Sequence, residues 1–134
     1  MSDFQQQQIK IITELSVKDL IDLQKTMGAK IVVIKFSAQW CKPCKMIKPT
    51  WDYWIQNNKQ TNIIYCELDI DETMDLYIAL KKFKMVNGIP ALLMYQGNLR
   101  RDHWFVPDDS FVGGDVEGFK LFLNRCVLKA KSIS

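Results

Sequence analysis

Two cysteines separated by two residues, Cys41 and Cys44, are the side chains of this sequence best suited to chemistry. Thiols at this spacing can close a small disulfide ring, and the free backbone amides at the start of a helix stabilise a thiolate on the first of them. Cys41 is therefore the expected nucleophile. Cys44 would be shielded until a mixed disulfide forms on Cys41, and would then attack that disulfide. The pair predicts thiol–disulfide exchange.

A structural zinc site is the competing interpretation of such a pair. Zinc usually takes four ligands. The remaining candidates, Cys66, Cys126 and His103, offer no second close pair. We therefore expect no metal and no cofactor other than the Cys41–Cys44 disulfide, and we interpret Cys66 and Cys126 as small apolar core residues.

The cysteine pair must be held where a strand gives way to a helix. Residues 31–36 form a β-branched run that predicts a buried strand ending just before the pair. A helix is expected from Lys42 towards Asn57, bent or interrupted at Pro49 because proline lacks a backbone donor. The motif is thus predicted to lie on a strand-to-helix turn.

The other predicted elements surround this turn. Strands are expected at 9–12, 62–68 and 91–95, and 99–106 is expected to return as a hairpin partner after a turn at Gly97-Asn98. Helices are expected from a Ser16 cap to Gly28, over 73–84, and from an Asp115 cap to the end. Alternating strands and helices predict an α/β fold with one mixed sheet covered on both faces.

Composition limits the class of protein. The chain has 134 residues, of which 48% are hydrophobic and 25% charged, as is usual for a globular domain. We expect a polar tail over 1–8, which includes four glutamines, and a single domain over 9–134. The net charge of +3 with scattered lysines does not indicate a nucleic-acid partner. Neither a secretory signal nor a membrane span is recognisable, so we expect a cytoplasmic protein.

The segment from Phe36 to Pro49, which includes Trp40-Cys41-Lys42-Pro43-Cys44, resembles the active-site segment of the thioredoxin family. The resemblance extends to 69–71, 88–91 and Gly113, and so spans most of 9–130. It implies a thioredoxin fold with about five strands and about four helices. It also implies a monomeric protein that reduces protein disulfides, takes electrons from a thioredoxin reductase-like donor, and serves electron transport and cell redox homeostasis.

The resemblance also assigns roles to residues near the cysteines. Pro90 would follow a cis peptide bond and face the disulfide. Trp40, Ile89, Pro90 and Gly113 would form the surface that receives substrate, and Pro43 would support the active site. Trp51, Tyr53 and Trp54 are better interpreted as packing aromatics.

Three departures from the family pattern modify this expectation. Lys42 replaces the usual glycine and should favour the Cys41 thiolate, which makes a poorer reductant. Lys35 replaces a buried aspartate, and Glu67 falls where many members have lysine, which gives either a buried charge-swapped pair or a surface pair. In the buried case Glu67 is the candidate to take the proton of Cys44.

The third departure is a longer segment over 104–114, which would either edge the substrate groove or extend the hairpin tip. Two alternative functions follow. One is an oxidase or isomerase of the same fold, favoured by Lys42. The other is a redox-regulated adaptor that holds a partner through the 104–114 segment.

Overall fold

The computed structural model describes residues 9–134, and the predicted tail over 1–8 lies outside the described residues. Its elements in chain order are β1 (Ile11–Ile12), α1 (Val17–Thr26), β2 (Ile31–Ser37), α2 (Lys42–Asn57), β3 (Ile63–Asp69), α3 (Met74–Lys82), β4 (Ala91–Gln96), β5 (Asp109–Val112) and α4 (Val116–Ile133). The strands form one sheet in the order β1-β3-β2-β4-β5. β1, β3 and β2 are parallel, whereas β4 is antiparallel to both β2 and β5.

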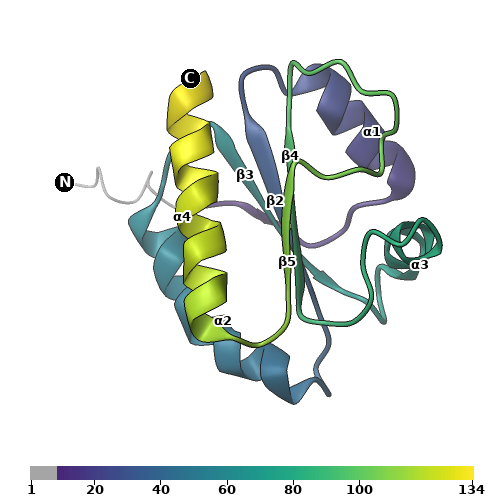
Figure 1. Cartoon of the computed structure of the whole chain (residues 1–134), viewed down its shortest axis with the longest axis vertical. Coiled ribbons are helices and arrows are strands. Elements are labelled where there is room, and N and C mark those ends of the chain that lie inside the picture. Colours follow the sequence, from purple (N-terminus) through teal and green to yellow (C-terminus); the bar gives the residue numbers. More distant parts are fainter. Residues whose placement is uncertain (1–8) are drawn as a thin grey trace.

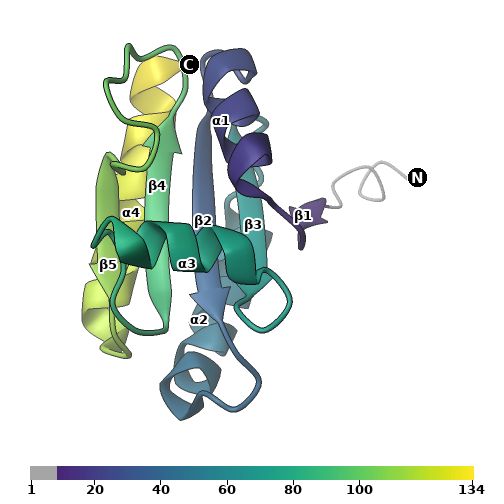
Figure 2. The same cartoon turned by 90° about the vertical axis from the view of Figure 1, so that its right-hand side faces the viewer.

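The sheet lies between two layers of helices. In Figure 1 the sheet is seen nearly on edge, with α2 and α4 on one side and α1 and α3 on the other. Figure 2, turned by 90°, shows α1 and α3 in front of the strands. The expected mixed α/β sheet with both faces covered is therefore confirmed. Among residues 9–134, no helix has the length and apolar character needed to cross a membrane.

Side chains along β2 alternate between the two faces of the sheet. Val32, Ile34 and Phe36 enter the core under α1 and α3. Ile31 and Val33 enter the core under α2 and α4. Because successive side chains of a strand point to opposite faces, Lys35 shares the second face and lies beneath α2.

The helix termini follow the expected signals. Ser16 caps α1 through a reciprocal capping box with Asp19, and Gly28 follows the helix with a positive φ of 72°. Asp115 caps α4 by accepting the backbone N–H of Gly118 at 3.2 Å. These three local predictions are confirmed because each depends on chemistry within a few residues.

The helix after the cysteine motif continues through its proline. α2 runs from Lys42 to Asn57 with Pro49 inside it. Trp51 and Trp54 are buried and meet Tyr65 edge to face, as expected of packing aromatics. Tyr53 is 71% exposed, so its assignment as a packing residue was wrong. It lies on the helix face that points away from the sheet.

The strand expected over 99–106 is absent from the described fold, and its place beside β4 is taken by β5 at Asp109–Val112. Residues 97–108 form a long loop at the hairpin tip, at the upper right of Figure 1. This loop packs against α1 and α3: Gln24 donates to the Trp104 carbonyl at 2.8 Å, and Phe83 stacks on Phe105. The structure divides the longer segment between the two expected placements: residues 104–108 lie in the hairpin tip, Asp109–Val112 form β5, and Gly113–Gly114 return to Pro90 and Pro43 beside the cysteine motif.

Candidate functional site

Cys41 and Cys44 are joined by a disulfide at the N-terminus of α2. Cys41 is the N-cap residue, between the end of β2 and the first turn of the helix, and its Cα lies 5.2 Å from that of Cys44. The backbone N–H of Cys44 donates to Cys41 Sγ at 3.2 Å. This amide has no partner within the helix, so it is free to stabilise negative charge on Cys41.

Both sulfur-bearing side chains are enclosed in the disulfide form. Cys41 is 3% exposed and Cys44 is 4% exposed. They pack with Ala38, Ile70 and Ile89, and Cys41 Sγ lies 3.9 Å from the Ile89 carbonyl oxygen. The expected shielding of Cys44 is present, but Cys41 is enclosed just as fully. Position at the helix N-cap, and not exposure, therefore distinguishes the two thiols.

Trp40, immediately before the disulfide, is the most exposed aromatic beside it, with 66% of its surface accessible. Its indole N–H donates to Asp71 Oδ2 at 2.9 Å. The backbone N–H of Asp71 in turn donates to Asp69 Oδ1 at 2.8 Å. Sequence analysis had assigned no role to Asp71, although it belongs to the 69–71 segment. The carboxylate fixes the orientation of an exposed ring.

Ile89, Pro90 and Gly113 come together beside the disulfide. The Ile89–Pro90 peptide bond is cis. The Pro90 carbonyl accepts the backbone N–H of Gly113 at 2.9 Å, one step beyond the last β4–β5 pair. Gly113 has a φ of 121°, which side-chain-bearing residues rarely adopt. The next residue, Gly114, lies so close to Pro43 that an added Cβ would be 3.0 Å from the proline Cβ.

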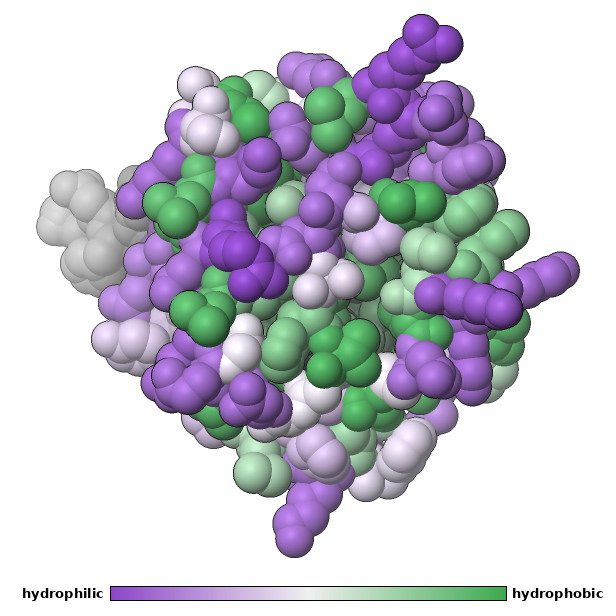
Figure 3. All heavy atoms as spheres, viewed as in Figure 1, coloured by the Kyte–Doolittle hydropathy of each residue, from purple (hydrophilic) through white to green (hydrophobic). Residues whose placement is uncertain are grey.

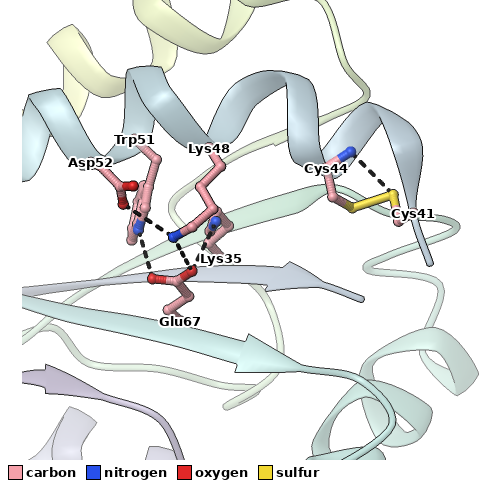
Figure 4. A network of polar contacts seen from close by, with 7 residues as sticks. All are labelled: Lys35, Cys41, Cys44, Lys48, Trp51, Asp52 and Glu67. Atoms are coloured by element: carbon pink, nitrogen blue, oxygen red, sulfur yellow. Dashed lines mark hydrogen bonds and ion pairs between the residues drawn. A yellow bond between two sulfur atoms is a disulfide. The ribbon is translucent and has the colours of Figure 1, made fainter. Parts of the chain in front are cut away.

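A charged network lies between α2 and the sheet, beyond Cys44. Lys35 and Glu67 are register partners on β2 and β3, and Lys35 Nζ lies 3.3 Å from Glu67 Oε2. The Lys35 side chain is 1% exposed and that of Glu67 is 25% exposed, so the pair is the buried alternative. Figure 4 shows Lys48 and Trp51 also reaching the same carboxylate from α2.

The two additional contacts had not been expected. Lys48 Nζ lies 3.4 Å from Glu67 Oε2 and 3.3 Å from Asp52 Oδ1, and the Trp51 indole N–H donates to Glu67 Oε1 at 3.2 Å. Lys35 also lies 5.3 Å from the centre of the Trp51 ring. Helical spacing from Cys44 would have placed Lys48 and Trp51 on the sheet side of α2, which is the signal that was available in the sequence.

These contacts change the proton affinities of the network. Burial lowers the pKa of Lys35, although the Glu67 carboxylate opposes this effect. Burial alone would raise the pKa of Glu67, but Lys35 and Lys48 outweigh it and hold that pKa below its usual value. Glu67 therefore remains a carboxylate and is a weak proton acceptor.

A cleft of about 600 Å³ joins this network to the disulfide, because Cys44, Lys35 and Glu67 all line it. Lys42 is exposed at the first position of α2. Cys66 and Cys126 are fully buried free thiols, and burial raises the pKa of Cys66 to about 12. Within residues 9–134, no group of three or more His, Cys, Asp or Glu side chains gathers as a metal ion would require.

Comparison with known proteins agrees with this arrangement. The chain is 47% identical to thioredoxin of Homo sapiens over 49 residues, a match that covers 37% of this chain and 45% of the relative. The thioredoxins of Equus caballus and Bos taurus are each 45% identical over the same length. The chain thus spans less than half the length of the curated relatives that it matches.

Solved structures support the fold over a longer span. The thioredoxin of Malassezia sympodialis has a TM-score of 0.66 at 22% identity, covering 90% of this chain and 96% of that structure. The thioredoxin of Plasmodium falciparum has a TM-score of 0.61 at 19% identity, covering 87% and 98%. The family model described as thioredoxin matches residues 16–106, which is more than half of the chain. The chain belongs to the thioredoxin family.

Proposed function

We propose that this protein is a thiol–disulfide oxidoreductase that reduces protein disulfides through Cys41 and Cys44. The observation that carries the proposal is the disulfide at the N-terminus of α2, where the first sulfur accepts a free backbone N–H. A thiolate is the attacking species in disulfide exchange, and this position favours it.

The reaction proceeds in two exchanges. The Cys41 thiolate attacks one sulfur of the substrate disulfide, so that a mixed disulfide forms on Cys41 and the other substrate sulfur leaves as a thiolate and takes a proton. Cys44 then loses its proton and attacks Cys41 Sγ, which closes the Cys41–Cys44 disulfide and releases the second substrate thiol. The substrate gains two electrons and two protons, and the cysteine pair is oxidised.

Trp40, Ile89, Pro90 and Gly113 are proposed to form the surface that receives the substrate, and Pro43 is proposed to support the active site. The arrangement supports this because the exposed Trp40 precedes Cys41, with its ring held by Asp71, and the Ile89 carbonyl lies beside Cys41 Sγ. The Ile89 carbonyl beside Cys41 Sγ is a backbone acceptor available to an extended substrate segment.

Lys35 and Glu67 are proposed to support the second exchange. A cation near Cys44 favours its thiolate. Because Lys35, Lys48 and Trp51 already occupy the Glu67 carboxylate, we assign Glu67 to positioning Lys35 and no longer to accepting the Cys44 proton itself. The shared cleft gives that proton a route towards solvent.

Regeneration of the dithiol requires an electron donor. We propose a thioredoxin reductase-like protein for this step, a reducing compartment such as the cytoplasm, and a monomeric protein active in electron transport and cell redox homeostasis. An oxidase or isomerase is the second candidate, because Lys42 beside Cys41 and Lys35 behind Cys44 both favour thiolates, and stable thiolates make the disulfide more oxidising.

The adaptor alternative is weakened by where the 104–114 segment lies. It is divided between the tip loop, β5 and the Gly113–Gly114 turn, so it does not make one surface.

The direct test is insulin reduction with a thioredoxin reductase, followed by trapping with single-cysteine variants. We expect Cys41→Ser to abolish reduction, whereas Cys44→Ser should accumulate mixed disulfides on Cys41 that mass spectrometry identifies. Cys66→Ser is the matched control and should retain activity. Adducts on Cys44 in the Cys41→Ser protein, with none on Cys41 in the reverse variant, would reverse the assigned order.

A further inference from the structure

The end of α3 and the β4–β5 loop carry aromatic rings that the redox site does not use. Phe105 stacks on Phe83 with ring centroids 3.9 Å apart, and His103 stacks on Phe105 at 5.1 Å. Trp104 lies edge-on to both phenylalanines. Phe83 is 41% exposed, His103 is exposed, and Trp104 and Phe105 are half-buried. We call these four residues the aromatic face.

Hydrogen bonds hold the loop that presents these rings. The Tyr95 hydroxyl donates to the Phe105 carbonyl at 3.0 Å, and the buried Gln24 amide donates to the Trp104 carbonyl at 2.8 Å. Arg101 donates to the carbonyls of Gln96 at 2.9 Å and Val106 at 3.1 Å. The rings therefore occupy fixed positions, which reduces the conformational entropy that this loop loses when a partner binds.

The charge around the aromatic face is strongly asymmetric. Residues 81–84 and 98–108 together contain five basic and two acidic side chains, a net charge of +3. This equals the net charge of the whole chain, so acidic and basic residues balance over the remainder. Lys81, Lys82 and Lys84 are exposed beside Phe83. Figure 3 shows hydrophobic atoms on this right-hand side with hydrophilic side chains projecting among them.

We propose that the aromatic face and its rim of Lys81, Lys82 and Lys84 form a docking surface for an acidic protein segment that carries aromatic side chains. Lysine charges attract and orient the carboxylates of such a segment. The exposed ring edges and faces accept an aromatic side chain in a stacked or edge-on geometry. The face lies over α1 and the end of α3, and none of its residues belongs to the cluster that packs around the disulfide.

Binding is tested with the oxidised protein and a fluorescein-labelled peptide that alternates glutamate with phenylalanine, followed by fluorescence anisotropy. We expect Lys81→Glu, Lys82→Glu and Lys84→Glu together to weaken binding at least about tenfold. The matched control reverses the same number of exposed lysines on α4, with Lys120→Glu, Lys129→Glu and Lys131→Glu, and should change the affinity less than about twofold. Phe83→Ser is the second variant and should also weaken binding.

Three results would overturn the proposal. Equal loss in both charge-reversed proteins would indicate unspecific attraction, and equal binding of a peptide with serine in place of phenylalanine would indicate that the rings play no part. Tighter binding of single-stranded DNA than of the peptide would identify a nucleic acid as the ligand. Reduction of a small disulfide should be unchanged in the Lys81, Lys82 and Lys84 variant. The docking surface and the redox function can therefore fail independently.

Discussion

At the scale of single residues, the unusual feature of this protein is a buried lysine between α2 and the sheet, in the cleft that Cys44 also lines. A buried ammonium is costly unless it is paired, and Lys35 is 1% exposed with Glu67 as its register partner. The carboxylate is itself shared with Lys48. The network therefore depends on Glu67 more than on either lysine, because its loss leaves two cations together.

This dependence predicts non-additive stabilities. Glu67→Gln alone should cost about 3 kcal/mol, because it leaves the buried Lys35 charge uncompensated, whereas Lys35→Met alone should cost less, because Glu67 keeps Lys48 as a partner. The double variant should cost less than the sum of the two single variants. Chemical denaturation of the four proteins measures the coupling. Additive losses below about 1 kcal/mol would show a pair that behaves as a surface ion pair.

The same variant tests the second exchange. The Glu67 carboxylate opposes the lowering of the Lys35 pKa by burial, so Glu67→Gln should lower that pKa further and reduce the fraction of protonated Lys35. With less positive charge near Cys44, resolution of the mixed disulfide should slow. Single-turnover kinetics with a preformed Cys41 adduct measure this step. Asp52→Asn, which removes the other carboxylate from Lys48 and leaves the Lys35–Glu67 ion pair in place, is the control.

Lys42 leads to a prediction about the reduction potential. Replacing this exposed lysine by glycine removes a charge that favours the Cys41 thiolate, so the potential should become more negative, by about 30 mV or less because solvent screens the charge. Equilibration with glutathione measures it. Lys59→Gly makes the same charge change away from the disulfide and should leave the potential unchanged. A shift to a less negative potential would contradict the argument.

At the scale of elements, the sequence predicted the helices and the first four strands well because their signals are local. Ser16, Asp115 and the β-branched run of β2 each act within a few residues. The fifth strand was misplaced because 99–106 and Asp109–Val112 compete for one edge of β4. Register decides that competition: Val112 pairs with Ala91 and Asp109 with Met94, which no local pattern reveals.

The residues of the candidate site also differ in how far the sequence alone could predict them. The cysteine motif could be predicted from its spacing, and the resemblance to thioredoxins together with the expected strand order pointed to the Lys35–Glu67 pair. Lys48 and Trp51 follow Cys44 at helical spacing, a signal that was available but not used, whereas the contact of Trp40 with Asp71 depends on side-chain directions in three dimensions. Tyr53 was misassigned although it lies two residues after the buried Trp51, a spacing that puts two side chains on different faces of a helix.

Gly97, in the loop after β4, lies against the turn that follows α1, and a substitution at Gly97 tests this contact. It follows β4, and a Cβ there would overlap the Gly28 carbonyl oxygen after α1 and press on the Met27 side chain. Gly97→Ala should therefore destabilise the protein by about 1–3 kcal/mol, since backbone atoms must move. Urea unfolding measures the loss. Arg100→Ala, at an exposed site three residues on, should stay within about 0.5 kcal/mol of the parent. An unchanged midpoint for Gly97→Ala would mean that the loop after β4 and the turn after α1 do not touch.

At the scale of the whole molecule, the ion network and the aromatic rings lie on opposite faces of the sheet. The face under α2 and α4 holds the ion network, and the disulfide lies at the N-terminus of α2. The face under α1 and α3 is covered at its far end by the 97–108 loop with its aromatic rings. Charge follows this division, because the excess of basic residues belongs to 81–84 and 98–108 and not to the ion network.

The ion network should be visible in the acid stability of the whole protein. Lys35 and Lys48 hold the pKa of Glu67 below its unfolded value against the effect of burial. Between those two values the unfolded chain binds more protons than the folded one, so stability falls as the pH falls through this range. A protonated glutamic acid and a glutamine are both uncharged and of similar shape. The stability difference between the parent and Glu67→Gln should therefore be full near neutral pH, begin to shrink below about pH 4.5, and nearly vanish once the pH is below the folded pKa. Urea unfolding of both proteins from pH 7 to pH 3 measures the difference. A constant difference across that range would mean that Glu67 stabilises the fold without its charge.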